Sequence, residues 1–173
     1  VMSGRVGGFF DSKIYGAAVA TLESEFSAIC AAYSPMNVDF TAFKKPFSML
    51  DMREIERSAL EDGNPFHNYF TSVLRDRIEA FAPDVCGLSV AFPGQLELAY
   101  AIALILKRAL PDMHLTVGGP ALTQLFARLD AQEAAAALKP FDTAVMFEGE
   151  KPLLDLVRDV ERGGKPRGVI RGG

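Results

Sequence analysis

Three apolar segments decide the fold: Val85-Cys86-Gly87-Leu88-Ser89-Val90, His114-Leu115-Thr116-Val117 and Thr143-Ala144-Val145-Met146-Phe147. Each is short and rich in apolar or β-branched residues, and helical patterns separate them, so they predict parallel strands of one sheet. Each runs into a glycine-bearing or polar tip, at residues 91–95, 118–120 and 148–150. Because ligands of open α/β sheets bind outside the carboxyl ends of the strands, we expect the three tips to form one ligand-binding edge.

From residue 64 onward the helix and strand patterns alternate. This order predicts an α/β protein with a Rossmann-like (flavodoxin-like) doubly wound parallel sheet, in three α/β/α layers with right-handed crossovers. The expected helices and the weak terminal strand lie at residues 66–81, 96–110, 121–138 with a break near Asp130, 151–162 and 168–170. A Rossmann-like domain is therefore assigned to residues 64–173.

Residues 1–63 form an N-terminal helical and irregular segment, and whether it belongs to the same domain stays open. The patterns predict an amphipathic helix at 15–32, a short strand at 38–43 and a helix at 51–60 that Ser48 or Asp51 caps. A first strand of the sheet is not evident. Either it lies in residues 5–10, or the chain begins inside the domain.

The bulk composition excludes several classes of protein. With 173 residues, of which 49% are hydrophobic, the chain can bury a sizeable core and is not disordered. Eighteen basic against 22 acidic residues argue against a nucleic-acid partner, because a phosphate backbone requires a basic surface. No membrane span or signal peptide is evident. Of the two cysteines, Cys30 and Cys86, the second lies in an apolar strand and predicts a buried free thiol, so a cytoplasmic location is the simplest inference.

The first two tips offer three residues that can contact a ligand. Gly118 and Gly119 end the second strand, where glycine permits a sharp turn and a close approach of a ligand to the backbone. A tight turn without any ligand explains the pair equally well. The hydroxyl of Ser89 can donate to a ligand oxygen or satisfy a neighbouring backbone group. The G-x-G-x-x-G and P-loop patterns are absent.

The remaining tip residues also have two interpretations each. Gln95 offers a donor and an acceptor, although a glutamine at a helix start is usually solvated. Phe92 is either a lid over a ligand or part of the core, and we prefer the core. Glu148 and Gly149 lie at the third tip. Glu148 is the better functional candidate of the two acids there, because the helix dipole alone accounts for Glu150 in the first helical turn.

Neither histidine predicts a metal site or a catalytic group. His67 lies in the first turn of a helix, and His114 opens a strand at the end of the sheet away from the tips. Neither belongs to a multi-ligand pattern. No serine has the context of a nucleophile elbow, and no Cys–His pair is indicated. We therefore expect no catalytic residue and no metal ligand in this chain.

Four segments, in this order and at fitting distances, resemble the cobalamin-binding-like domain that precedes the catalytic barrel of many radical S-adenosylmethionine proteins. They are Asn64-Pro65-Phe66-His67-Asn68-Tyr69-Phe70, Pro83-Asp84-Val85-Cys86-Gly87-Leu88-Ser89-Val90, Gly118-Gly119-Pro120 and Glu148-Gly149-Glu150-Lys151-Pro152-Leu153. The likeness covers roughly residues 64–160, and the ordered set of four is specific where each piece alone is weak. Residues 9–15 and the helix after them look like an insertion seen in some of these proteins.

The resemblance implies a sheet that holds the nucleotide tail of a corrinoid at its edge. By this analogy Ser89 contacts the tail, Gly118 and Gly119 give it room beside the backbone, and Glu148 and Gly149 line the third tip. The chain would then be an accessory domain, not catalytic alone, of an enzyme that transfers methyl groups or modifies a peptide. S-adenosylmethionine and the [4Fe-4S] cluster would belong to a barrel domain C-terminal to it, which is the implied partner.

Two family motifs are missing. Many cobalamin domains carry D-x-H-x-x-G, whose histidine is the lower axial ligand of cobalt. Asp112-Met113-His114 matches its first half, but Val117 stands where the glycine should be. A bound cobalamin would therefore lack that histidine ligand, as in many radical-enzyme relatives. The C-x-x-x-C-x-x-C motif is missing as well, so we expect an accessory domain that ends where the barrel would begin.

Two other functions stay open. The same fold without a corrinoid could act as a docking or substrate-recognition module, which the missing histidine motif and the doubtful first strand favour. A flavodoxin-like regulator or nucleotide binder is the third possibility. The acidic pair that a phospho-acceptor regulator needs at its first strand end is not found.

Overall fold

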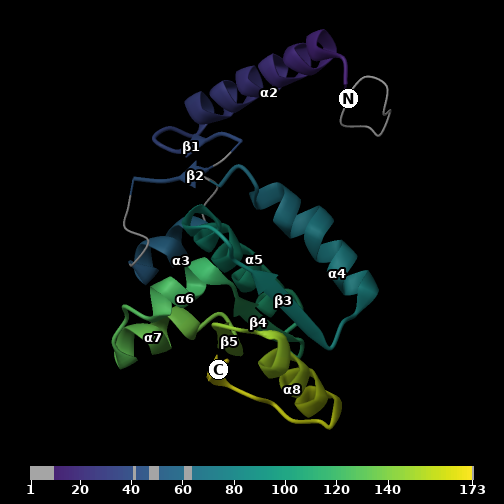
Figure 1. Ribbon diagram of the computed structural model, residues 1–173, viewed down its shortest axis with the longest axis vertical. Helices are drawn as coiled ribbons and strands as arrows, with labels where there is room; N and C mark the ends of the chain where they lie inside the picture. The colour runs from purple at the N-terminus through teal and green to yellow at the C-terminus, as the bar shows by residue number, and fades with distance from the viewer. Residues whose placement is uncertain (1–9, 41, 47–50, 61–63, 173) are drawn as a thin grey trace. The chain divides into compact units, whose positions relative to one another are not determined.

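The computed structural model describes residues 10–40, 42–46, 51–60 and 64–172 (Figure 1). It divides into two compact units, Val1–Pro46 and Phe47–Gly173, which we call the N-terminal unit and the sheet unit. The strand expected at residues 5–10 lies outside the described residues apart from Phe10, and so does the Ser48 cap.

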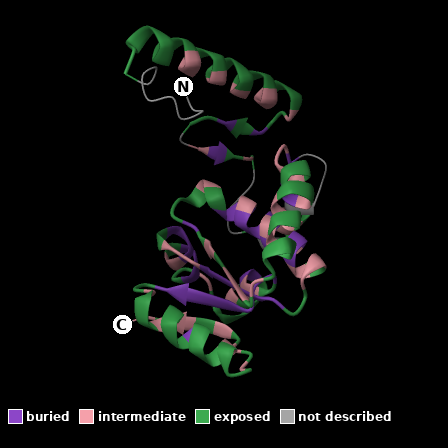
Figure 2. Cartoon of the chain, turned by 90° about the vertical axis from the view of Figure 1, so that its right-hand side faces the viewer, coloured by how far each residue is buried: buried purple, intermediate pink, exposed green. Residues whose placement is uncertain are grey.

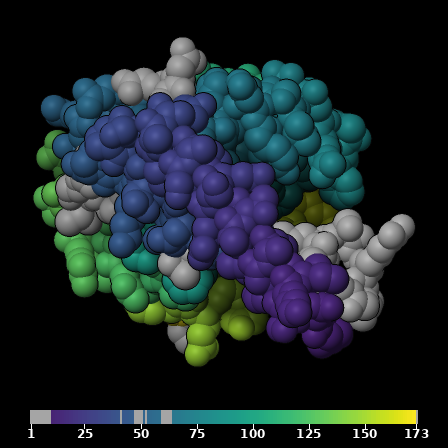
Figure 3. Space-filling view, turned by 90° about the horizontal axis from the view of Figure 1, so that it is seen from above, coloured from purple at the N-terminus to yellow at the C-terminus, as the bar shows by residue number. Residues whose placement is uncertain are grey.

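The N-terminal unit is one long helix and a small hairpin. The helix α2 (Ser12–Ala32) begins three residues earlier than expected because Asp11 caps it, accepting from Lys13 N–H at 2.9 Å and Ile14 N–H at 3.2 Å. No residue of α2 is buried, and its side chains, purple in Figure 3, are seen from above. The single strand expected at 38–43 is instead two strands, β1 (Asn37–Val38) and β2 (Phe43–Lys44), paired antiparallel. The turn residue Asp39 splits the pattern, because its carboxylate accepts from Ala42 N–H at 2.9 Å.

The sheet unit contains a four-stranded parallel sheet in the order β3-β4-β5-β6. Its strands are β3 (Val85–Ser89), β4 (His114–Gly118), β5 (Thr143–Met146) and β6 (Gly168–Arg171). The register pairs Ser89 with Gly118 and Gly118 with Val145, so the first three strands end together. This confirms the predicted three-layer α/β fold and the common edge of the three tips.

Side chains alternate between two unlike faces of this sheet. The core face carries larger apolar residues, which belong to one cluster with residues of several helices, among them the three that connect β3, β4 and β5; Figure 2 shows this part of the sheet as buried. Its residues include Cys86, Leu88, Leu115, Val117, Ala144 and Met146. The helices are α5 (Leu96–Ala109), α6 (Pro120–Phe126) and α7 (Ala131–Leu138). The opposite face carries Gly87, Ser89, Thr116, Gly118 and Val145, and we call it the small-residue face. The helix α8 (Glu150–Glu161) lies on it and buries Leu156.

Most helix boundaries agree with the sequence predictions. The break near Asp130 is confirmed: its carboxylate accepts from Gln132 N–H and Glu133 N–H, both at 2.8 Å, and the Glu133 carboxylate accepts from Asp130 N–H at 2.9 Å. This reciprocal capping box starts α7. The helix expected at 66–81 differs, because a π-helical segment, Tyr69–Leu74, precedes α4 (Arg75–Phe81).

The connections between the strands do not all have one hand. The helices that link β3 to β4 and β4 to β5 lie on the core face, whereas α8, which links β5 to β6, lies on the opposite face (Figures 1 and 2). The strand order nevertheless continues in one direction. The β5–α8–β6 connection therefore has the opposite hand to the two before it. Parallel connections are almost always right-handed, so the prediction of right-handed crossovers throughout is wrong.

Neither cysteine forms a disulfide. Cys86 is only partly buried, less than its apolar strand suggested, and burial raises the pKa of its thiol. Among the described residues, no helix combines the length and the apolar character that crossing a membrane would require.

The sheet unit begins before residue 64. Its first helix, α3 (Met52–Leu60), is capped by Asp51, whose carboxylate accepts from Arg53 N–H at 3.1 Å and Glu54 N–H at 3.2 Å. Ile55 of α3 is completely buried in the core cluster that includes α5. The division observed in the structure therefore lies N-terminal to α3, earlier than the boundary expected at residue 63.

Replacing Ile55 with alanine tests this assignment. We expect Ile55→Ala to lower the free energy of unfolding of the sheet unit by about 2–5 kcal/mol, because it leaves a cavity between α3 and the core. Arg53→Ala, on the exposed side of the same helix, is the control and should cost less than about 0.5 kcal/mol. Urea unfolding followed by far-UV circular dichroism measures both. Equal stability of the two variants would show that α3 does not belong to this core.

Candidate functional site

A cavity opens on the small-residue face at the carboxyl ends of β3, β4 and β5. It has a volume of about 450 Å³, which is within the usual range of small-molecule sites. Its floor consists of Gly87, Ser89, Thr116, Gly118 and Val145, and its walls include Phe147, Gly149, Glu150 and Leu153. We call it the tip cavity.

The floor of the tip cavity is nearly flat, because the residues that face it are small, while the residues between them along each strand face the core. A Cβ on Gly87 would lie 3.6 Å from Thr116 Cγ2, an ordinary contact. A Cβ on Gly118 would lie 3.1 Å from the carbonyl oxygen of Val145, which is tighter than usual. Larger side chains at either position would occupy the space of the cavity. These two strand positions, where β-branched residues are common, therefore carry no side chain that would rise into the cavity.

Gly119 has a structural reason of its own. Its φ is +112°, and a Cβ there would lie 2.5 Å from the carbonyl oxygen of Val90. That carbonyl accepts from Ala121 N–H at 3.2 Å, and Val90 N–H donates to the Gly118 carbonyl at 2.8 Å. The tips of β3 and β4 are therefore joined by backbone hydrogen bonds that only glycine can accommodate. The tight-turn interpretation of Gly119 applies whether or not a ligand is bound.

Four of the seven predicted site residues line the tip cavity: Ser89, Gly118, Gly119 and Gly149. They come from three separate segments, which the parallel register brings together. The Ser89 side chain is exposed and makes no hydrogen bond to the residues that the structure describes. Its hydroxyl is therefore available to a ligand.

The other three predicted residues lie outside the lining of the tip cavity. Gln95 organises the loop after β3, because its Oε1 accepts from Ala91 N–H at 2.8 Å and Phe92 N–H at 3.1 Å. Phe92 is 66% exposed, so the preferred assignment of this ring to the core is wrong. The loop holds it away from the helices that cover the core face. Glu148 is exposed, and Glu150 is the acid that lines the cavity.

Sequence reasoning missed Gly87, Thr116, Val145, Phe147 and Leu153 as lining residues. A signal for three of them was present. Once Ser89 and Gly118 are placed on one face, the period of two along a strand puts Gly87 and Thr116 on that face, and the register adds Val145. Phe147 and Leu153 depend on where the third tip and α8 turn, which no local pattern specifies.

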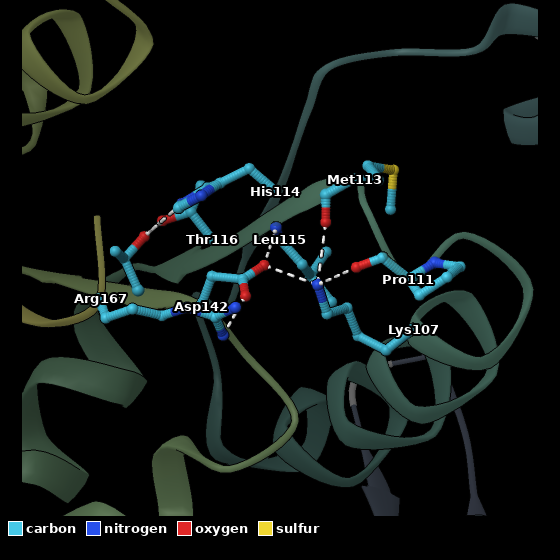
Figure 4. A network of polar contacts seen from close by, with 9 residues as sticks. Lys107, Pro111, Met113, His114, Leu115, Thr116, Asp142 and Arg167 are labelled. Carbon is cyan, nitrogen blue, oxygen red and sulfur yellow. Dashed lines mark hydrogen bonds and ion pairs between the residues drawn. The ribbon is translucent and has the colours of Figure 1, made fainter. Parts of the chain in front are cut away.

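A second cavity, of about 510 Å³, lies at the amino ends of the strands. It is lined by more charged residues than the tip cavity, and three of them, Asp142, Lys107 and Arg167, form one network (Figure 4). One carboxylate oxygen accepts from Leu115 N–H at 2.7 Å and Lys107 Nζ at 2.8 Å, and the other forms an ion pair with Arg167. The ammonium of Lys107 also donates to the carbonyls of Met113 and Pro111.

His114 belongs to the same end of the sheet. Its Nε2 lies 3.0 Å from Thr143 Oγ1, and Thr143 Oγ1 lies 2.9 Å from Thr116 Oγ1, so the three side chains form one chain of hydrogen bonds. The histidine is therefore at the edge opposite the tip cavity, as predicted. The amino-end cavity has a structural explanation: its charges tie β4, β5, α5 and the start of β6 together.

Burial and charge shift two pKa values in this network. Burial raises the pKa of Asp142, but the hydrogen bond from Leu115 N–H, the bond and charge of Lys107, and the charge of Arg167 outweigh it, so the pKa lies below its ordinary value. For His114, burial lowers the pKa, Lys107 and Arg167 lower it further, and Asp142 opposes them. The folded state thus favours an ionised Asp142 and a neutral His114.

Among the described residues, no three His, Cys, Asp or Glu side chains gather in a way that would hold a metal ion. In comparisons with known proteins, no family model, no curated protein and no solved structure matches the chain. The site is therefore interpreted from its own residues.

Removing the charge of Asp142 should destabilise the sheet unit. We expect Asp142→Asn to lower the free energy of unfolding by about 2–4 kcal/mol, because it leaves Lys107 without its buried partner. Asp155→Asn is the matched control, because Asp155 pairs with Lys151 at 2.6 Å on the surface, where solvent screens the pair, and its loss should change the stability far less. Urea unfolding measures both, and equal losses would contradict the structural role of the network.

The neutral state of His114 predicts a pH dependence of stability. A histidine whose pKa is lowered on folding stabilises fully above its unfolded pKa of about 6.5, and this contribution decreases as the pH falls towards the folded pKa. Between pH 7 and pH 5 the wild-type protein should lose stability that His114→Gln, which cannot titrate, retains. Asp142 titrates at lower pH and does not contribute in this interval. If the urea midpoints of the two proteins change by the same amount between pH 7 and pH 5, His114 does not have a lowered pKa in the folded state.

Proposed function

We propose that the tip cavity binds the nucleotide tail of a corrinoid, and that this chain is the cofactor-binding accessory domain of a radical S-adenosylmethionine enzyme. The observation that carries the proposal is the tip cavity itself, with its flat floor of small residues at the carboxyl ends of three parallel strands. Four residues that the resemblance assigned to the corrinoid, Ser89, Gly118, Gly119 and Gly149, line it.

The chemistry of the lining fits the tail of such a cofactor. Gly87 and Gly118 leave room above the sheet that a Cβ and a longer side chain would fill. The hydroxyl of Ser89 can donate to the base or the ribose, and the carboxylate of Glu150 can accept from a ribose hydroxyl. Most of the rest of the lining is apolar or backbone. A small number of polar groups in a mainly apolar cleft is typical of cofactor sites.

Cobalt would have no protein ligand from His114, which is bonded to Thr143 at the other end of the sheet. The corrinoid would supply methyl-transfer or redox chemistry when bound. This chain would hold its tail and orient its ring, and the partner barrel domain would supply the iron–sulfur cluster and S-adenosylmethionine. The chain alone is therefore proposed to bind and not to catalyse.

Titration with hydroxocobalamin, followed by the corrin absorption spectrum and by calorimetry, tests the proposal. We expect saturable binding to the wild-type protein and a loss of affinity of at least about tenfold in Gly87→Val, because the new side chain fills the floor of the cavity. Since Gly87 does not have a positive φ and a Cβ there meets no close contact, this variant should fold with unchanged or higher stability.

Two controls accompany the titration. Gly16→Val makes the same chemical change in α2, where a Cβ meets nothing within 4 Å, and should bind like the wild type. Gly119 is not a suitable probe, because its replacement strains the backbone irrespective of any ligand. If the wild-type protein binds no corrinoid, the proposal fails.

A further inference from the structure

Phe147 has a backbone conformation that residues with a bulky side chain rarely adopt. Its φ is +64°, in the left-handed region that favours glycine or asparagine. Among the described residues one other non-glycine residue has a positive φ, Ala82 at +47°. Ala82 ends α4 as a left-handed cap, which is a common role for this conformation. Phe147 follows a strand and ends no helix.

The strain at Phe147 is not offset by burial of its side chain. The residue is 57% exposed, although it follows β5, all of whose residues are buried. Its conformation is held from the backbone instead, because Phe147 N–H donates to Thr123 Oγ1 of α6 at 3.1 Å. Residues kept in unfavourable regions of φ and ψ are concentrated at ligand sites, where the geometry itself is used.

The position of Phe147 indicates what that use is. The residue lines the tip cavity together with Leu153 of α8, beside the flat floor of Gly87, Ser89 and Gly118. A planar ring that lies on this floor would have an aromatic wall within reach. Among the described residues, Glu150 is the one charged residue of the lining, so this part of the chain offers no cation to a phosphate group in the cavity. The part of a ligand that suits it is an uncharged heteroaromatic ring together with the hydroxyls of its ribose, which can donate to the Glu150 carboxylate.

We propose that Phe147 is a specificity-determining residue of the tip cavity: its strained backbone presents the ring as a stacking wall for the base of the bound cofactor, while the phosphate of the tail stays outside. This inference rests on the proposed function and deepens it. It assigns the benzimidazole base, and neither the corrin ring nor the phosphate, to the cavity. Stacking of a base on an aromatic side chain typically strengthens binding by about five- to hundredfold.

The test compares two corrinoids and two variants. The wild-type protein should bind hydroxocobalamin at least about tenfold more tightly than cobinamide, which lacks the nucleotide tail. Phe147→Asn removes the ring and places a residue that tolerates a positive φ. It should weaken hydroxocobalamin binding by about tenfold, leave cobinamide binding unchanged, and raise or preserve the urea midpoint. Phe147→Tyr keeps the ring and the strain, and should bind both corrinoids as the wild type does.

The outcomes separate this inference from the proposed function. If the wild-type protein binds neither corrinoid, both fail. If it binds hydroxocobalamin, the proposed function stands, and the inference is overturned by equal affinities for the two corrinoids or by undiminished binding in Phe147→Asn. A lower urea midpoint of Phe147→Asn also overturns it, because Phe147 would then be a packing residue. Increased stability together with weakened binding is the result that supports a strained stacking wall.

Discussion

The alternation of side chains along β3, β4 and β5 is the constraint on which the rest of the sheet unit depends. Successive residues of a strand point to opposite faces of the sheet. Every second residue therefore faces the helices of the core and must be apolar to pack against them. Leu115, Val117 and Met146 belong to this set and are almost completely buried. The other set is then free to be small. Gly87, Ser89 and Gly118 form a surface that the core does not need, and a ligand can lie there.

The two ends of the sheet differ in how their polar groups are paired. At the amino ends the Asp142 carboxylate accepts hydrogen bonds from Leu115 N–H and Lys107 and forms an ion pair with Arg167. Such a cluster stabilises the fold as a unit, and a ligand would have to compete with its own hydrogen bonds. At the carboxyl ends the lining has few polar groups, and the Ser89 hydroxyl makes no hydrogen bond to the described residues. The tip cavity is therefore a better candidate for a ligand site than the cavity at the amino ends.

Two residues at the strand tips have a positive φ, and they differ in what explains it. Gly119 allows the backbone of β4 to approach Val90 within a distance that no Cβ permits, so the turn accounts for it. Phe147 has a bulky side chain in the same region of φ, with its ring exposed beside the tip cavity. The first is a requirement of packing. The backbone strain at Phe147 is not offset by burial of its side chain, and such strain is typical of ligand sites.

The sequence by itself determined most of the elements and the common edge of the three strand tips. Local patterns indicate where strands end, that the helical segment breaks near Asp130, and that the three tips meet once the strands are parallel; they left the cap of α3 open between Ser48 and Asp51. Four of the seven residues named from those patterns, Ser89 among them, line the cavity. Local patterns did not assign Phe92 correctly. The sequence around an apolar residue next to a strand is the same whether or not a helix covers its side chain in the fold.

Only the tertiary structure decided which face carries the cavity and what walls it has. The face on which α8 lies, the hand of its connection and the left-handed backbone of Phe147 depend on contacts between segments far apart in the sequence. The same holds for Asp142, whose partners lie on α5, on β4 and just before β6. Periodicity encodes the alternation within one strand, but the packing of one element on another is a property of the whole chain.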